Sequence, residues 1–354
     1  MITENKKIVI KNIKRFFVLA FIPFFLAGPA AAQKARREKG GFFFNFENDT
    51  FYGTDKNYSS GLNFSWVSPE VYHMEEKNSF QGKMDSFIHH LALIRREGFK
   101  SALHISLAQK IFTPEDIKET DLIENDRPYA GITYMVFGIQ SRDSFRMDTL
   151  NIQIGILGPH SYAENMQSFI HKILGDKLPQ GWDNQLKDEL IINISYGTKR
   201  KWISEGHIQG FSGELIPHLR GTMGNGYTGL DAGAELRIGW NIPDDFGTYL
   251  IKRGGGIPAV PNTPRLRNQR YGFGLYVFAA VFGQAVMRDI FLDGNTFRKS
   301  HHVEREKFYG TGALGVGVTL GRVKVGYSAV WQSKRFVYQT KPHVYGAIHF
   351  SIML

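Results

Sequence analysis

Hydrophobic and polar residues alternate along much of the chain, and the clearest example lies near its beginning. Phe42, Phe44 and Phe46 share one face of a predicted strand, and a second strand over residues 58–66 repeats the pattern after a turn. Such a hairpin gathers four polar side chains at one rim: Asn48, Asp49, Ser59 and Ser60. These residue types also favour turns for local reasons, so the hairpin alone leaves their function open.

Similar alternation recurs to the end of the chain and predicts twelve strands in all. They cover residues 42–47, 58–66, 101–112, 130–141, 149–158, 189–200, 210–222, 229–240, 271–287, 307–320, 323–331 and 343–354. Single-chain bacterial barrels have an even number of strands, and the last segment suits a strand that closes such a barrel.

One stretch departs from this pattern. Residues 163–186 carry apolar residues at helical spacing: Met166, Phe169, Ile170, Ile173 and Leu174. Gly175 is well placed to end the helix, and a second helical turn is predicted to begin at Trp182.

Two all-β folds compete for this pattern. A secreted β-sandwich would turn polar faces outward, whereas here each strand has one apolar, often aromatic face and one small or polar face. Gly is abundant (38) and aromatic residues make up 14% of the chain. We therefore predict an all-β fold: a twelve-stranded antiparallel transmembrane β-barrel, with a short helix beside its wall.

The N-terminus has the features of a secretory signal peptide. Five Lys or Arg residues precede the apolar run 16–28, and small residues follow up to Ala32. We predict a signal peptide over residues 1–32 and a single outer-membrane barrel domain over residues 33–354. A thirteen-residue apolar run is too short for a comfortable membrane helix.

Charge and cysteine content narrow the choice of partners. The chain has a formal net charge of +10 and no cysteine. A basic secreted chain favours anionic lipid surfaces, and the sequence shows no nucleic-acid-binding signature. We therefore expect outer-membrane lipids as partners and no binding to nucleic acid. We also expect the protein to be a monomer.

The predicted helix carries Gln167 and His171, which are four residues apart and therefore share one face. Histidine is the usual general base near neutral pH, although a histidine on an apolar helix face is more often a hydrogen-bonded core residue. The segment 125–131 (NDRPYAG) enters the fourth strand, where Asp126 suits a local cap.

Familiar catalytic motifs are absent from the sequence. It has no G-x-S-x-G and no H-E-x-x-H. Glu47, Asp49 and Asp55 offer oxygen ligands, which suit a hard cation such as Ca²⁺. Basic residues between Lys252 and Arg270 could bind phosphate groups.

Three segments resemble a known family. FENDTFYGTDKNYSSGL, NDRPYAG and LGPHSYAENMQSFIHKILGDKLPQGWDNQL look like the lipid A 3'-O-deacylases of the Gram-negative outer membrane. The resemblance covers the chain after the signal peptide and is most specific in its N-terminal half. It implies a twelve-stranded barrel and a Ca²⁺-dependent esterase that removes the 3'-linked acyloxyacyl chain of lipid A.

The resemblance also implies roles for six residues. His171 would activate water and Gln167 would support it, while Asn48 and Asp49 would lie at the end of the first strand, with Asp49 contributing to the Ca²⁺ site. Ser59 matches a position where a hydroxyl is expected. Lys118 is the candidate for a basic residue near the oxyanion.

Two other classes of function stay open. One is a phospholipase-like serine hydrolase in which Ser59 or Ser60 is the nucleophile and His171 its base. The other is a barrel without catalysis, either a channel or a structural protein, although a twelve-stranded barrel filled with side chains would be narrow for a pore.

Overall fold

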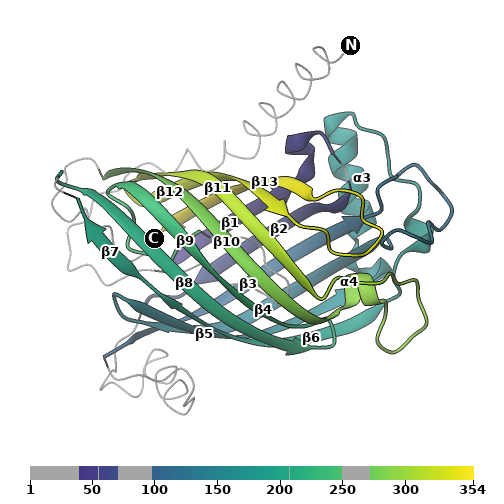
Figure 1. Ribbon diagram of the computed structural model, residues 1–354, viewed down its shortest axis with the longest axis horizontal. Helices are drawn as coiled ribbons and strands as arrows, with labels where there is room; N and C mark the ends of the chain where they lie inside the picture. The colour runs from purple at the N-terminus through teal and green to yellow at the C-terminus, as the bar shows by residue number, and fades with distance from the viewer. Residues whose placement is uncertain (1–39, 55, 71–97, 207, 249–271) are drawn as a thin grey trace.

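The computed structural model describes residues 40–54, 56–70, 98–206, 208–248 and 272–354 (Figure 1). The predicted signal peptide, Asp55 and the basic residues between Lys252 and Arg270 lie outside these ranges. Within them, no helix is long and apolar enough to span a membrane.

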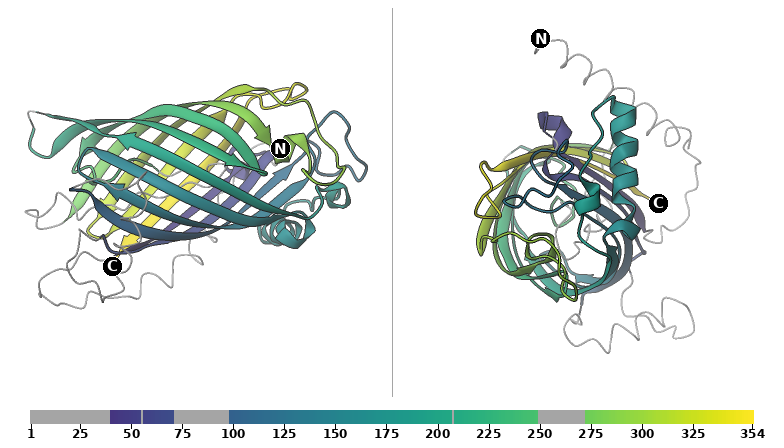
Figure 2. Two further views of the ribbon diagram at one scale, coloured as in Figure 1. Left: turned by 90° about the horizontal axis from the view of Figure 1, so that it is seen from below. Right: turned by 90° about the vertical axis from the view of Figure 1, so that its right-hand side faces the viewer.

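The strands form one closed antiparallel sheet (Figures 1 and 2). Its segments are β1 (Gly41–Asn48), β2 (Asn57–Val67), β3 (Lys100–Thr113), β4 (Ala130–Arg142), β5 (Arg146–Leu157), β6 (Glu189–Arg200), β7 (Trp202–Glu205), β8 (Phe211–Gly224), β9 (Tyr227–Trp240), β10 (Phe273–Asp289), β11 (Phe308–Leu320), β12 (Val323–Gln332) and β13 (His343–Met353). Each strand pairs with its neighbours in the chain, and β1 pairs with β13 to close the ring. Both β6 and the short β7 pair with β8, so the two are one wall strand interrupted at Lys201. The prediction of twelve strands is confirmed.

Side chains alternate across this wall as the barrel prediction requires. Large apolar residues are exposed on the outer face, among them Phe64, Leu107, Ile152, Val277 and Leu314. Polar residues are buried on the inner face, among them Asn63, Ser106, Asn151, Asp231 and Ser328. An apolar exterior and a polar interior are typical of membrane-spanning barrels and opposite to a soluble sandwich.

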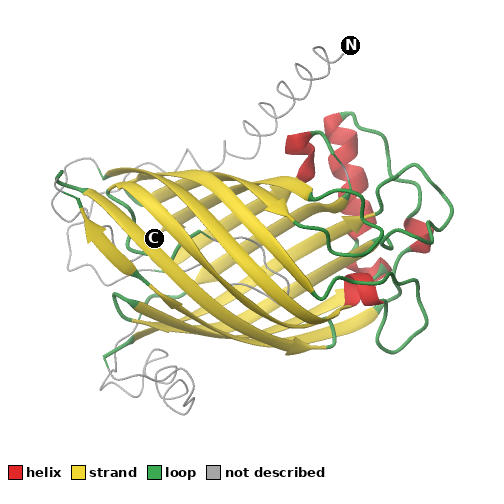
Figure 3. Ribbon diagram, in the orientation of Figure 1, coloured by secondary structure: helices red, strands yellow, loops and turns green. Residues whose placement is uncertain are grey.

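Five short helices lie at one end of the barrel, the helical end (Figure 3). They are η1 (Asp49–Tyr52), η2 (Pro159–Ser161), α3 (Ala163–Leu174), η3 (Trp182–Asn184) and α4 (Ile290–Asp293). The predicted helix corresponds to α3, and Gly175 ends it in the left-handed conformation, with φ 74°. The predicted second turn corresponds to η3, whereas η1, η2 and α4 were not predicted.

The opposite end of the barrel is filled by the chain itself. Residues 242–248, here called the lumen segment, follow β9 and place Ile242 and Phe246 among buried residues. Asp244 pairs with Lys201 beside β6, and Asp245 pairs with Lys324 of β12 at 2.6 Å. Because β6 and β12 belong to different parts of the ring, the lumen segment crosses the interior.

Candidate active site

Helix α3 lies against the outside of the barrel wall, near the helical end. Ile111 of β3 and Gly131 of β4 are paired residues on the outward face, and Ile111 packs with Ala163, Tyr129 and Trp182. A Cβ atom at Gly131 would lie 2.0 Å from the Cβ of Ala163, so the helix approaches the wall as closely as glycine permits. The end-on view shows α3 at the outside of the ring (Figure 2).

The two polar residues predicted on one helix face are both buried. Gln167 is 2% exposed and His171 is 6% exposed, although neighbouring residues of α3 such as Phe169 face outward. Their shared face is therefore the one turned away from solvent and lipid, as the spacing of four residues predicts.

Both side chains are held by the return segment, residues 176–184, which follows the helix. The Nδ1 atom of His171 lies 2.5 Å from the carbonyl oxygen of Lys177. A carbonyl only accepts hydrogen bonds, so Nδ1 carries the proton and the lone pair of the neutral ring is on Nε2. The indole Nε1 of Trp182 donates a hydrogen bond of 3.0 Å to Oε1 of Gln167.

Asn48 and Ser60 form a second polar group on the outer face. The register of β1 and β2 places them directly opposite each other. The side chain of Asn48 also caps η1, because its Oδ1 accepts the backbone N–H of Thr50 at 2.7 Å. Phe51 of η1 packs edge-on against Phe46 and Tyr327, which keeps η1 on the outside of the wall.

Asp49 provides a buried carboxylate next to this pair. Its Oδ2 accepts the backbone N–H of Lys56 at 2.7 Å and the hydroxyl of Thr54 at 3.1 Å. A carboxylate that directly follows the amide of Asn48 in the chain offers oxygen ligands of the kind that a hard cation prefers. In the described ranges, no three His, Asp or Glu side chains cluster as a metal site, so amide and carbonyl oxygens or water would have to complete the coordination.

Glu47 was wrongly grouped with Asp49 as a possible cation ligand. It is completely buried and faces the barrel interior, where it accepts a hydrogen bond of 2.7 Å from the hydroxyl of Tyr58. Adjacent residues of a strand point to opposite faces, so Glu47 cannot share the outer face with Asn48.

Ser59 and Ser60 sit at an irregularity in β2. The register with β3 shifts between Tyr58 and Ser60, which leaves Ser59 as the extra residue. The Ser59 Oγ lies 2.6 Å from Oγ1 of Thr113, so this hydroxyl is paired with another hydroxyl.

The strand register relates the wall positions of the two polar groups across three adjacent strands. Asn48 pairs with Ser60, and Ser60 pairs with Ile111, each step spanning about 5 Å between strands. Ile111 in turn packs with Trp182, the hydrogen-bond partner of Gln167. Asn48 and Ser60 thus lie on β1 and β2, next to the part of β3 and β4 against which α3 packs.

Lys118 lies in the loop after β3, and its side chain is exposed. Its backbone N–H bonds to Asp116, and the neighbouring carbonyl of Ile117 accepts the N–H of Gln180 at 2.8 Å. The loop therefore contacts the return segment, while the role of the Lys118 side chain remains a prediction.

Comparison with known proteins decides the family. A model of the family described as outer membrane protein LpxR matches residues 17–354. The chain belongs to this family. The resemblance to the lipid A deacylases is thereby confirmed at the family level, and the outer membrane is the location that it supports.

The fold of an LpxR protein has also been solved. LpxR from Salmonella typhimurium superposes with a TM-score of 0.67 at 18% sequence identity, over 89% of this chain and 100% of that chain. The β-domain of the Bordetella autotransporter BrkA covers 90% of this chain and 99% of its own at 8% identity, with a TM-score of 0.43. No curated protein matched the sequence.

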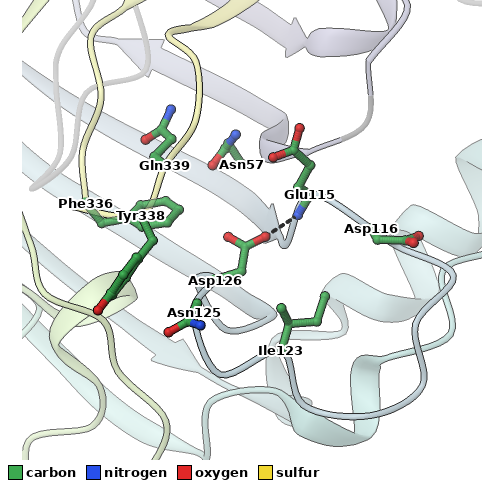
Figure 4. A pocket seen from close by; sticks show the side chains of 9 residues that line it. All are labelled: Asn57, Glu115, Asp116, Ile123, Asn125, Asp126, Phe336, Tyr338 and Gln339. Carbon is green, nitrogen blue, oxygen red and sulfur yellow. Dashed lines mark hydrogen bonds between the residues drawn. The ribbon is translucent and has the colours of Figure 1, made fainter.

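A separate cavity of about 280 Å³ lies between the loop after β3 and the loop before β13 (Figure 4). Its lining includes Glu115, Asp116 and Asp126. Burial raises the pKa of Asp126, although backbone N–H groups of Glu115 and Arg127 oppose this. A hydrogen bond from Lys56 lowers the pKa of Glu115. Since three carboxylates line it, this cavity does not suit phosphate.

The basic residues between Lys252 and Arg270, which could bind phosphate groups, lie outside the described residues. That expectation stays a prediction.

Proposed function

We propose that this protein is an outer-membrane esterase that removes the 3'-linked acyloxyacyl chain from lipid A of lipopolysaccharide. Membership of the LpxR family supports the substrate class. The observation that carries the proposal is the pair Gln167 and His171, held on α3 against the outward face of β3 and β4. The outer face of the wall meets lipid, where the acyl chains of this substrate lie.

The chemistry needs one base and one water molecule. Neutral His171 accepts a proton from water at Nε2 while the water oxygen attacks the carbonyl carbon of the ester. The bond between the acyl carbon and the sugar oxygen then breaks, and the imidazolium returns the proton to the leaving alkoxide. The products are a free acid and a sugar hydroxyl, so atoms and charge balance.

A Ca²⁺ ion is the proposed cofactor, with Asp49 as its carboxylate ligand and Asn48 nearby. When bound, such an ion would stabilise negative charge that develops on the carbonyl oxygen. The side chain of Asp49 is fixed for this by Thr54 and the backbone of Lys56. Lys118 is proposed as a second source of positive charge.

The serine-hydrolase alternative has less support. A nucleophilic serine is normally hydrogen-bonded to its base. Ser59 instead bonds to Thr113, and Nδ1 of His171 bonds to Lys177. A water nucleophile, with Ser59 as a neighbouring hydroxyl, fits these contacts better.

The channel alternative is also disfavoured, because the lumen segment crosses the interior at one end. Arg237 bonds to both Glu214 and Asp245, and Lys324 bonds to Asp245. These buried ion pairs hold charged side chains inside the barrel. We expect the purified protein to add no stepwise conductance to a planar bilayer.

Mass spectrometry of lipid A tests the proposal directly. Gram-negative cells would express the wild type, His171→Ala or His302→Ala, the last being an exposed histidine with no role in the site. We expect the wild type and His302→Ala to remove one acyloxyacyl unit and His171→Ala to remove none. Folding is checked by the heat-dependent migration of the barrel in gels.

One result of this experiment would reject the proposed substrate. Unchanged lipid A in cells that hold folded wild-type protein, repeated with purified protein and added Ca²⁺, would reject lipid A as the substrate. Phospholipid vesicles would then be tested with the same three proteins. Hydrolysis there, blocked by serine-directed reagents, would favour the serine-hydrolase class.

A further inference from the structure

The return segment holds Gln167 and His171, two buried polar residues of α3, at the same time. The carbonyl of Lys177 contacts His171, and the indole of Trp182 contacts Gln167, so six residues of chain position two helix side chains. Trp182 is 2% exposed and also packs against Tyr129, with ring centroids 5.0 Å apart.

This segment is anchored independently of α3. The backbone of Gln180 donates to the carbonyl of Ile117 at 2.8 Å, and the side chain of Asn184 donates to the carbonyl of Thr120 at 2.7 Å. Gly181 lies so close to this loop that a Cβ atom there would be 2.7 Å from both the Glu119 carbonyl oxygen and the Tyr129 ring. The indole of Trp182 is therefore fixed by the barrel and the loop after β3, and not only by the helix that it supports.

The hydrogen bond determines the orientation of the Gln167 amide. An indole N–H can only donate, so the atom facing it must be the amide oxygen. Rotating the amide by half a turn would place two donors against each other in a buried site, which is unfavourable. The NH₂ group of Gln167 is thus directed away from Trp182.

We propose that Trp182 is a positioning residue that fixes Gln167 as a hydrogen-bond donor toward the substrate ester. The inference rests on the proposed esterase function. It assigns Gln167 a specific role: its NH₂ group donates a hydrogen bond to the carbonyl oxygen of the ester and stabilises the negative charge that develops there. Trp182 itself does not touch the reacting atoms.

A double-mutant cycle tests this assignment with purified enzyme. Trp182→Phe keeps an aromatic ring but loses the donor. We expect it to lower kcat about 10-fold or more with little change in KM, because loss of one oxyanion donor typically lowers kcat about 10²-fold to 10³-fold. In the Gln167→Ala background, Trp182→Phe should cause no further loss. Trp202→Phe, at an exposed tryptophan near the other end, is the matched control.

Gln167→Glu separates the donor role from simple packing. Its carboxylate still accepts a hydrogen bond from Trp182 but has no N–H to offer, so we expect activity as low as that of Gln167→Ala. Full activity of Gln167→Glu would overturn the donor assignment. Independent, multiplicative losses from Trp182→Phe and Gln167→Ala would show that Trp182 does not act through Gln167.

The hydrogen bond can also be followed without any substrate. In protein labelled with ¹⁵N at its five tryptophans, the Trp182 indole signal is assigned by its loss in Trp182→Phe. We expect Gln167→Ala to shift that signal, and an unshifted signal would overturn the inference whatever the activity. An inactive wild type whose signal shifts in Gln167→Ala would reject the esterase function and the donor role that depends on it, but would leave the Trp182–Gln167 contact established.

Discussion

Asn48 and Ser60 lie directly opposite each other on β1 and β2, with both side chains on the outer face of the barrel. The residue before Asn48 in the chain, Glu47, faces the interior. The end of β1 therefore divides its polar residues between two environments, and only one set is available to a molecule in the membrane.

Docking of α3 depends on the absence of a side chain at Gly131. We expect Gly131→Ala to displace the start of α3 and lower deacylation at least 10-fold, because its Cβ would lie 2.0 Å from that of Ala163. The barrel itself should still fold. Gly213→Ala is the matched control, since a Cβ there meets only one backbone oxygen, at 3.9 Å. Equal activity of the two variants would show that α3 placement does not matter.

Removal of the Asp49 charge should weaken cation binding. Because Asp49 is the proposed carboxylate ligand, we expect Asp49→Asn to bind radioactive Ca²⁺ at least 10-fold more weakly in equilibrium dialysis and to lose deacylation. Asp121→Asn changes an exposed carboxylate in a nearby loop and should behave as the wild type. Unaltered Ca²⁺ binding by Asp49→Asn would reject Asp49 as a ligand.

Substitution of Ser59 separates the two possible nucleophiles. With a water nucleophile, we expect Ser59→Thr to retain most activity, because it keeps the hydroxyl beside Thr113, and Ser59→Ala to retain a measurable fraction. A nucleophilic serine would instead make Ser59→Ala inactive and the wild type sensitive to serine-directed reagents. Initial rates of lipid A hydrolysis, with and without such a reagent, distinguish these outcomes.

Asp245 should anchor the lumen segment through charge. Burial alone would raise its pKa, but the charges of Arg237 and Lys324 outweigh this and hold the pKa well below its ordinary value. We expect Asp245→Asn to lower the free energy of unfolding by about 3–5 kcal/mol, because Lys324 loses its carboxylate partner and Arg237 loses one of its own. Urea unfolding in detergent, followed by tryptophan fluorescence, measures this.

The pH dependence of that difference follows from the direction of the shift. Because the pKa of Asp245 is lowered in the folded protein, its carboxylate stabilises the fold fully above the unfolded pKa of about 3.9. This stabilisation is lost as the pH falls toward the pKa of the folded state. The gap between wild type and Asp245→Asn should therefore be constant from neutral pH to about pH 5 and shrink only in stronger acid. A gap that closed near pH 6 would contradict this assignment.

The sequence predicted the wall well because strand alternation is a local property. All twelve wall strands were located, and only β7 was missed, since Lys201 interrupts its alternation with β6. The shared face of Gln167 and His171 also follows from helical spacing alone. The contacts that hold them do not, because Lys177 and Trp182 depend on how a loop returns to the barrel. Glu47 is not a ligand on the outer face, because strand alternation directs it into the interior, where it bonds to Tyr58.

The position of α3 on the outside of the wall changes how a substrate would reach the site. A lipid would arrive by diffusing sideways within its own leaflet, without passing through the barrel or leaving the membrane. Encounter then takes place in two dimensions, so the rate would follow the mole fraction of substrate among the surrounding lipids and the fluidity of that leaflet. Diluting the membranes in buffer would leave that rate unchanged, whereas diluting the substrate with inert lipid would lower it.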